Sequence, residues 1–189
     1  MTVLTKDNLI DALAFDASEV KYVGTGEEFL AYHYDFLNCD GVIWITGGSV
    51  TLGGKDFQIS GKAYEDADDM TARRKIFELY TSNELNISLY SSGAGKNLDL
   101  FINCGGVYDN YNEPAILERE YEFALKWRQA EKTLTLTIDG EEIYSIGVEG
   151  LSEPQTFEQL LIGGSVYHTN ATWRGTISEF KIYDGYAEA

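Results

Sequence analysis

The chain has 189 residues, of which 44% are hydrophobic, and a formal net charge of −17. This length suits one domain with a sizeable core, and the hydrophobic share excludes an intrinsically disordered chain. The negative charge repels nucleic-acid phosphates and anionic membrane surfaces, so we expect neither as a partner, whereas neutral glycans, cations and basic proteins remain compatible.

The N-terminal residues carry no recognisable targeting signal. Met1–Val23 has no basic segment followed by an apolar core, so we expect no secretory signal, and no apolar run approaches the roughly 18 residues of a membrane span. The protein then works where it is made or leaves the cell as part of an assembly. Thr5–Leu13 predicts a short helix that Thr5 caps, with a tail that packs on a neighbour as the alternative for residues 1–13.

From Ala14 onward the pattern is that of strands. Val42–Ile45 is continuously apolar, as in a strand that is buried on both faces. Phe57, Ile59 and Gly61 alternate with polar residues, which predicts a strand with one face on the core. Glu65–Arg74 is the most charged interruption, and we expect a loop or one helical turn there.

The middle of the chain predicts further hairpins. Ile76–Tyr80 is extended, Leu85–Leu89 alternates, and Leu98–Cys104 completes a second hairpin. We expect Gly105–Ala115, which is polar and rich in Tyr, to be a loop. Alternation then predicts a strand from Tyr121 to Trp127.

The last third has the clearest strand pattern. In Thr133–Ile138 the leucines Leu134 and Leu136 share one parity, which predicts a strand with those side chains on the core. Asp139-Gly140 predicts a hairpin turn, and Leu151–Phe157 a loop. In the final strand, Gly175–Tyr183, the apolar parity changes near Ser178-Glu179, which indicates burial on both faces or a bulge. With about a dozen short strands and no linker or repeat, the fold class is all-β, a single sandwich domain over residues 1–189.

The C-terminal motifs resemble those of the concanavalin A-like lectin/glucanase superfamily, in its laminin-G-like branch. They are Ile138-Asp139-Gly140, Ile162-Gly163-Gly164, and the W-x-G-x-I-x-x-F-x-I-Y pattern from Trp173 to Tyr183. The clear similarity covers about 118–185. The resemblance implies a jelly-roll of two antiparallel sheets with the C-terminal strand beside N-terminal ones, but this fold hosts lectins, hydrolases, adhesion modules and spacers.

The sequence does not predict catalysis. Glucanases of this superfamily place carboxylates as Glu-x-Asp-x-Glu on one strand, where alternate side chains share a face. Glu118, Glu120 and Glu122 have the spacing without the central Asp, and we interpret them as the solvent face of a strand. The two histidines, His33 and His168, accompany no nucleophile motif, and no phosphate-binding glycine loop is present. We therefore expect a protein that is not an enzyme.

Metal binding and disulfide formation both stay open. The resemblance implies a Ca²⁺ ion at a loop rim, for which the oxygen-bearing candidates are Asp66, Asp68 and Asp69, or Asp109, Asn110, Asn112 and Glu113. Solvated loops are the alternative for both groups. The metal site we single out is Asp109, Asn112 and Glu113. Cys104 shares parity with core residues and predicts a buried thiol, and whether it pairs with Cys39 is undecided.

Two loops combine aromatic rings with amides and carboxylates, the mixture that a glycan site needs. They are 105–113 and 165–173, and the ligand candidates are Tyr108, Asp109, Tyr111, Asn112, Tyr167, His168, Asn170 and Trp173. Tyrosines that rim a sandwich are the alternative explanation. Trp173 occupies the position that usually caps the core in the resemblance, which implies packing. Trp44 and Trp127 are expected in the core.

Three functions follow from these observations. The first is a non-catalytic, lectin-like carbohydrate-binding or adhesion domain with a glycan or cell-surface polysaccharide as partner. The second is a structural or receptor-binding module of a phage tail or surface assembly, which as a homo-oligomer or larger assembly would show a high mass in solution. The third is a glycoside hydrolase, for which Glu118, Glu120 and Glu122 would be essential. The sequence itself favours the first.

Overall fold

The computed structural model describes residues 31–35, 43–45, 50–65, 73–92, 97–163, 173 and 175–184. Thr5–Leu13, Cys39, Asp66, Asp68, Asp69, Tyr167, His168 and Asn170 lie outside these residues. Within the described part of the chain, no helix has the length and apolar character needed to span a membrane.

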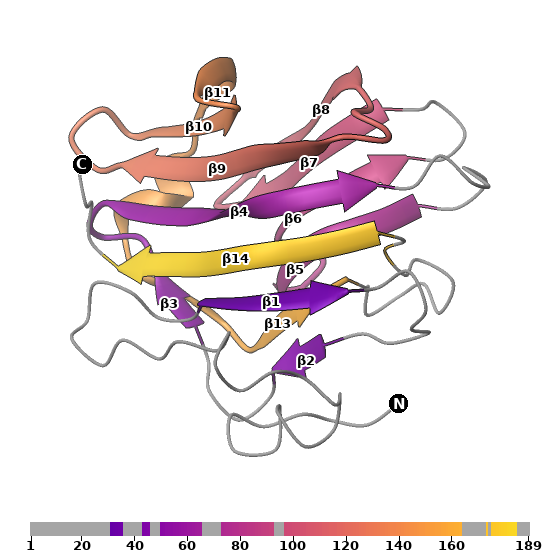
Figure 1. The fold of residues 1–189 in the computed structure, drawn as a ribbon. Coiled ribbons are helices and arrows are strands. Elements are labelled where there is room, and N and C mark those ends of the chain that lie inside the picture. The colour runs from indigo at the N-terminus through magenta and orange to yellow at the C-terminus, as the bar shows by residue number, and fades with distance from the viewer. Residues whose placement is uncertain are drawn as a thin grey trace.

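Two six-stranded antiparallel sheets are stacked as a sandwich, which confirms the predicted all-β fold class (Figure 1). The first sheet has the order β1 (Ala31–Asp35), β14 (Gly175–Asp184), β4 (Phe57–Glu65), β9 (Glu120–Arg128), β10 (Thr133–Ile138) and β11 (Glu141–Gly147). The second has the order β2 (Ile43–Ile45), β13 (Gln159–Ile162), β5 (Arg73–Ser82), β6 (Leu85–Ser92), β7 (Asn97–Cys104) and β8 (Val107–Pro114). A short pair joins β12 (Gln155–Phe157) to β3 (Val50–Leu52).

The core lies between the two sheets and is rich in aromatic rings. Phe77 of the second sheet contacts Phe123 and Phe180 of the first, with ring centroids 6.2 and 5.7 Å apart. Leu134 and Leu136 are buried as their parity predicted. Trp127 and Cys104 are also buried, and burial raises the pKa of the Cys104 thiol to about 11. A thiol with so high a pKa is a poor nucleophile at neutral pH.

The strand patterns of the C-terminal third are confirmed in detail. Asp139 and Gly140 have φ angles of 52° and 81° and join β10 to β11, as expected for a two-residue hairpin with positive φ at both positions. In β14 the register shifts between Ser178 and Lys181, and Glu179 has a φ of 52°. Of the two interpretations of the changed parity, the structure therefore shows a bulge.

Three predicted loops are wrong in whole or in part. Gly105–Ala115 contains strand β8, which runs along the edge of the second sheet and so lacks the apolar alternation of an inner strand. Leu151–Phe157 contains part of the short 3₁₀ helix η2 (Glu149–Ser152) and all of β12. The charged stretch Glu65–Arg74 begins and ends in strands, since Glu65 closes β4 and Arg74 belongs to β5.

Candidate functional site

The second sheet presents a polar and aromatic surface on the side that faces away from the core. Strand alternation and register place its members in rows across four strands. One row runs through Lys75, Tyr90, Asp99 and Asn112; a second through Glu78, Ser88, Phe101 and Asn110; a third through Tyr80, Asn86, Asn103 and Tyr108. We call these twelve side chains the β5–β8 outer face.

On the β5 side of this face, buried polar side chains are connected by hydrogen bonds and an ion pair. The Lys75 ammonium donates to the Ser88 hydroxyl at 2.6 Å and lies 3.3 Å from a Glu78 carboxylate oxygen. That carboxylate oxygen also accepts from the Asn86 amide nitrogen at 3.4 Å. Burial lowers the pKa of Lys75, while Glu78 opposes the shift. The Glu78 carboxylate therefore compensates the Lys75 charge inside the protein, and that charge is not presented to a ligand.

Tyr90 and Asp99 continue the network toward the exposed edge. The Tyr90 hydroxyl donates to the Asn110 side-chain oxygen at 3.0 Å, and the Lys75 ammonium lies 4.4 Å from the centre of the Tyr90 ring. Asp99 is 2% exposed, and burial raises the pKa of its carboxyl against the opposing effects of Ser92, Arg73 and Lys75. One Asp99 oxygen, Oδ1, is buried without a hydrogen-bond partner, as is Oδ1 of Asn86.

The β8 side of the face is open to solvent. Tyr108 is 72% exposed, and its ring meets the half-buried Phe101 ring edge-on with centroids 5.4 Å apart. Asn110 and Asn112 are exposed on the same strand. The result is an aromatic and amide shelf that borders the buried network, which can receive the apolar side of a ligand ring while polar groups meet its substituents.

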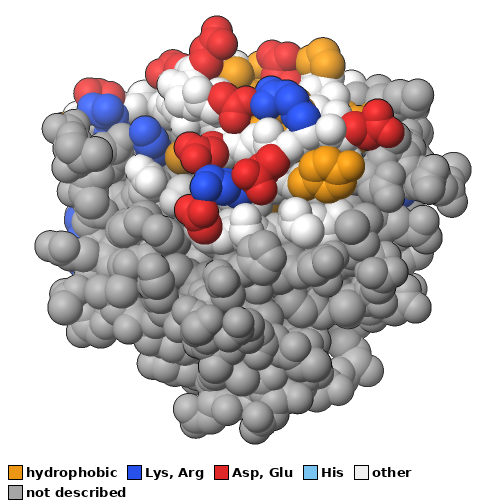
Figure 2. Space-filling view, in the orientation of Figure 1, with side chains coloured by type: hydrophobic (Ala, Val, Ile, Leu, Met, Phe, Trp, Pro, Cys, Tyr) orange, Lys and Arg blue, Asp and Glu red, His pale blue; other side chains and the backbone are white. Residues whose placement is uncertain are grey.

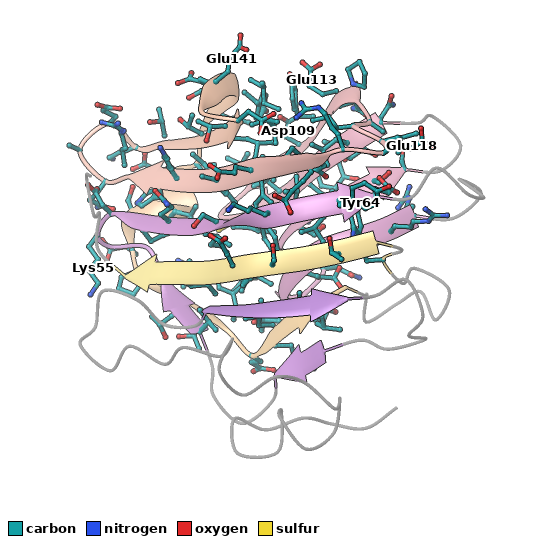
Figure 3. The ribbon with its side chains drawn as sticks, in the orientation of Figure 1. Lys55, Tyr64, Asp109, Glu113, Glu118 and Glu141 are labelled. Atoms are coloured by element: carbon teal, nitrogen blue, oxygen red, sulfur yellow. The ribbon has the colours of Figure 1, made fainter. Side chains whose placement is uncertain are left out.

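Strand β8 divides the residues that the sequence grouped as one ligand loop. Tyr108 and Asn112 belong to the β5–β8 outer face, whereas Asp109, Tyr111 and Glu113 have the opposite parity. Figure 3 shows Asp109 and Glu113 where β8 runs. Asn112 therefore points away from the two carboxylates, and the trio Asp109, Asn112 and Glu113 does not converge as ligands of one Ca²⁺ ion. Among the described residues, no three His, Cys, Asp or Glu side chains gather closely enough to hold a metal ion.

Tyr111 joins the edges of the two sheets. Its ring stacks on that of Tyr144 in β11 with centroids 4.1 Å apart. Its hydroxyl has two acceptors within reach, the Glu113 carboxylate and the Ile143 carbonyl, the latter at 2.7 Å. Burial, with the adjacent Glu113 carboxylate, raises the pKa of Tyr111 to about 12. These contacts give Tyr111 a packing role at the seam between β8 and β11.

Replacing Tyr111 with alanine is expected to lower the free energy of unfolding by about 2 kcal/mol, because the ring stack and the hydrogen bond are both lost. Tyr111→Phe keeps the stack and should cost only about 1 kcal/mol. Urea unfolding measures both. Tyr108→Ala is the matched control and should change stability by no more than about 0.5 kcal/mol, since that ring is mostly exposed; equal losses at the two tyrosines would contradict the seam role.

Trp173 is buried and belongs to the packing, which corrects its place among the ligand candidates. Its side chain is 0% exposed, and its indole nitrogen donates to the Tyr64 carbonyl at 3.2 Å. This is the core-capping position that the resemblance implied. Tyr167, His168 and Asn170, which precede it, lie outside the described residues.

The three glutamates with glucanase-like spacing are exposed, as predicted for a solvent face. Glu120 and Glu122 lie on the outer side of β9, and Glu118 precedes the strand with a φ of 57°. All three carboxylates are therefore open to solvent, whereas a general acid is held in a desolvated pocket.

The outer face of the first sheet has a different character. Acidic and basic side chains are intermixed on it (Figure 2), and a hollow of about 270 Å³ lies over Ser60, Gly61 and Ala124. Lys62 at its rim lies 2.7 Å from Glu179 and 3.8 Å from Glu122. The aromatic residue in its lining, Phe123, is 1% exposed. This hollow offers ion pairs in place of an aromatic shelf, so it is the weaker candidate for a sugar.

Sequence reasoning missed most of the β5–β8 outer face. Lys75, Ser88 and Asp99 each alternate with core residues and so read as ordinary solvent-facing positions. The residue types did carry a signal for a polar surface: Asn, Ser, Tyr and Asp recur at alternate positions of three consecutive strands. Register then brings them together, and that register depends on a bulge near Ile76 in β5 that single-sequence patterns do not reveal.

Comparisons with known proteins support the fold. No family model matches the sequence, and no curated protein matches it. The solved structures that resemble it include the CBM40 of the Ruminococcus gnavus IT-sialidase bound to α2,3-sialyllactose, with 15% identity, a TM-score of 0.53 and coverage of 90% of this chain and 92% of that one. A heptameric SAP-like pentraxin from Limulus polyphemus has 14% identity, a TM-score of 0.54 and coverage of 88% and 74%.

A third similar structure is the binding domain of botulinum neurotoxin serotype D, with 12% identity and a TM-score of 0.59. The match covers 92% of this chain but only 43% of the toxin domain. At these identities the similarity establishes a lectin-like β-sandwich fold, not a shared ligand or partner.

Proposed function

We propose that this protein is a non-catalytic carbohydrate-binding domain whose ligand lies on the β5–β8 outer face. The observation that carries the proposal is the aromatic shelf of the exposed Tyr108 ring and the half-buried Phe101 ring, together with the amides of Asn110 and Asn112 that are exposed on the same strand as Tyr108. Sugars present apolar C–H faces that stack on aromatic rings and hydroxyl groups that need hydrogen-bond partners, so this combination fits them better than purely apolar or purely charged ligands.

Two of the similar structures support the proposal by analogy. The sialidase CBM40 was solved with an oligosaccharide, and the toxin domain is a binding domain, while both are β-sandwiches like this chain. The acidic net charge is compatible with a neutral glycan and unfavourable for an anionic one.

A glycan array followed by isothermal titration of the best ligand tests the proposal. Tyr108→Ala should weaken binding by at least about tenfold, because the exposed ring of the shelf is removed. Tyr64→Ala is the matched control: it makes the same change on the first sheet, where Figure 3 labels Tyr64, and should leave the affinity unchanged. Absence of any binding glycan, or equal losses in the two variants, would contradict the proposal.

A further inference from the structure

The hairpin of β7 and β8 brings Phe101 and Asn110 close together on the exposed part of the β5–β8 outer face. Its turn has two residues, Gly105-Gly106, and Cys104 pairs with Val107 at the base of the turn. Residues that flank a two-residue turn exchange hydrogen bonds, and hydrogen-bonded and non-hydrogen-bonded pairs then alternate along the strands. Phe101 and Asn110 are the third pair from the base and are therefore not hydrogen-bonded to each other, which brings their Cα atoms to about 4.5 Å and their side chains close together.

The exposed side chain of Asn110 offers a hydrogen-bond donor to a ligand. Its amide oxygen accepts from the Tyr90 hydroxyl at 3.0 Å. Tyr90 belongs to the row of Asn112, on the other side of Asn110 from Tyr108, so this bond draws the oxygen toward that row. The amide nitrogen is therefore turned toward the Tyr108 side of the face, and it has no partner among the described residues. An amide nitrogen of this kind only donates hydrogen bonds.

The second exposed amide of β8, that of Asn112, has the opposite polarity. Its nitrogen donates to the Asn110 carbonyl at 2.8 Å, so its oxygen is the atom that can meet a ligand. The donor of the pair, Asn110, is the one that lies next to Tyr108 on the same face of the strand. Side chains at alternate positions of a strand are about 7 Å apart. A substituent of a sugar ring that stacks on Tyr108 can therefore reach the Asn110 nitrogen.

The two rings of the shelf form a corner and not a flat platform. The planes of Phe101 and Tyr108 are 86° apart. Tyr108 is mostly exposed, so its ring can stack on the apolar C–H face of a sugar, while the half-buried Phe101 ring offers a smaller apolar surface beside Asn110. One flat face of a ligand cannot lie on both rings. A ligand that uses the whole corner therefore needs a second apolar group, next to a hydrogen-bond acceptor, that projects out of the plane of its ring.

Substituents of neutral sugars differ in how well they meet this requirement. A hydroxyl group can accept from the Asn110 nitrogen, but it brings a polar group against the Phe101 ring. An acetamido group carries a carbonyl acceptor and a methyl group on the same carbon atom, and its plane stands out of the plane of the sugar ring. Its carbonyl can accept from Asn110 while its methyl group is buried against Phe101, and both contacts are favourable.

We infer, on the basis of the function proposed above, that the shelf selects glycans that contain an N-acetylhexosamine. The sugar ring stacks on Tyr108, the acetamido carbonyl accepts from the Asn110 amide nitrogen, and the acetamido methyl group contacts Phe101. Each of these three side chains is at least partly exposed, so a ligand can reach them. Asn110 thus determines the specificity of the shelf, whereas the Tyr108 ring contributes to the affinity for any pyranose.

Isothermal titration with two pairs of disaccharides tests the inference on the full chain. N,N′-diacetylchitobiose is compared with cellobiose, and N-acetyllactosamine with lactose, because the members of each pair differ only in acetamido or hydroxyl groups at C2. In at least one pair the acetamido sugar should bind at least about fivefold more tightly. The glycans that bind on the array should likewise contain an N-acetylhexosamine.

Asn110→Asp distinguishes a role in specificity from a role in folding. The substitution keeps an oxygen that accepts from Tyr90 and removes the donor, so the preference for the acetamido sugar should fall below about twofold. Asn110→Ala, which removes both amide atoms, is the second variant and should have the same effect. A merely structural role of Asn110 would weaken both members of a pair equally and leave the preference intact.

Gln58→Glu is the matched control, because it makes the same exchange of an amide for a carboxylate on the outer side of β4 in the first sheet, and it should leave the preference unchanged. Equal binding within both pairs, or binding on the array of only those glycans that lack an N-acetylhexosamine, would overturn the inference while the proposed function stands. A preference that persists in Asn110→Asp would overturn the role of Asn110. No binding of any glycan would remove the proposed function itself.

Discussion

Replacing Gly175 with alanine is expected to lower the free energy of unfolding by about 3 kcal/mol or more. Gly175 has a φ of 134°, and an added Cβ would lie 1.8 Å from the Tyr64 carbonyl oxygen. This position starts β14 opposite Glu65 of β4, so the backbone would have to move at the join between the C-terminal strand and the first sheet. Urea unfolding followed by tryptophan fluorescence measures the loss.

Substitutions at two other glycines distinguish the cost of the close Cβ contact from the cost of positive φ. Gly140 has a φ of 81° with nothing near its missing Cβ, so Gly140→Ala should cost about 1 kcal/mol. At Gly147 the nearest atom, the Lys132 carbonyl oxygen, lies 3.8 Å away, and the substitution should change stability by no more than about 1 kcal/mol. A Gly175→Ala loss no larger than that of Gly140→Ala would show that β14 relaxes without cost.

Replacing Arg74 with methionine is expected to lower the free energy of unfolding by about 3–5 kcal/mol at pH 8. The Arg74 guanidinium lies 3.4 Å from the Glu65 carboxylate, and the two side chains are 3% and 1% exposed. They come from different sheets, so the pair connects the two layers inside the sandwich. Methionine fills the space but leaves a buried carboxylate without its cation.

The same pair predicts how stability depends on pH. Burial raises the pKa of Glu65 to about 7, with Ser91 and Arg74 opposing the shift, against an ordinary value of 4.5. Between these two values the folded protein holds a proton that the unfolded chain releases. The contribution of Glu65 therefore falls as pH rises from about 4.5 to about 7, by about 3 kcal/mol in total.

The Arg74→Met loss should accordingly be much smaller at pH 5, where Glu65 is protonated, than at pH 8. The double variant Glu65→Gln with Arg74→Met should recover most of the stability at pH 8 and should lack the pH dependence between about 4.5 and 7. Chemical denaturation across this pH range provides the comparison with the unmodified protein. An Arg74→Met loss of equal size at both pH values would show that Glu65 does not carry the effect.

The candidate site could be predicted only in part. Tyr108 and Asn112 were identified because aromatic and amide residues cluster there, and both belong to the β5–β8 outer face. Tyr111 and Asp109 were grouped with them as members of a loop. The loop is an edge strand, in which neighbours alternate between faces, so the group divides into two.

Glu65 and Arg74 illustrate a different limit. Both fall at the ends of a strongly charged stretch, and charge of that density is ordinarily solvated. Each is instead buried near the end of a strand, Glu65 in β4 and Arg74 in β5, and forms an ion pair with the other across the two sheets. The sequence gives the charge of each residue, but it does not show which residue of the other sheet lies beside it.

Features that depend on local chemistry could be predicted from the order of residues: the period-2 alternation of Leu134 and Leu136, the positive-φ turn at Asp139-Gly140 and the changed parity of β14. Together they predicted an all-β sandwich. Which polar residues lie beside one another could be seen only in the folded protein, because it depends on the register between strands and on the bulge near Ile76. Asn86 and Asp99 each occupy an unremarkable alternate position. They form one surface because β6 and β7 pair in a register that places Phe101 between them.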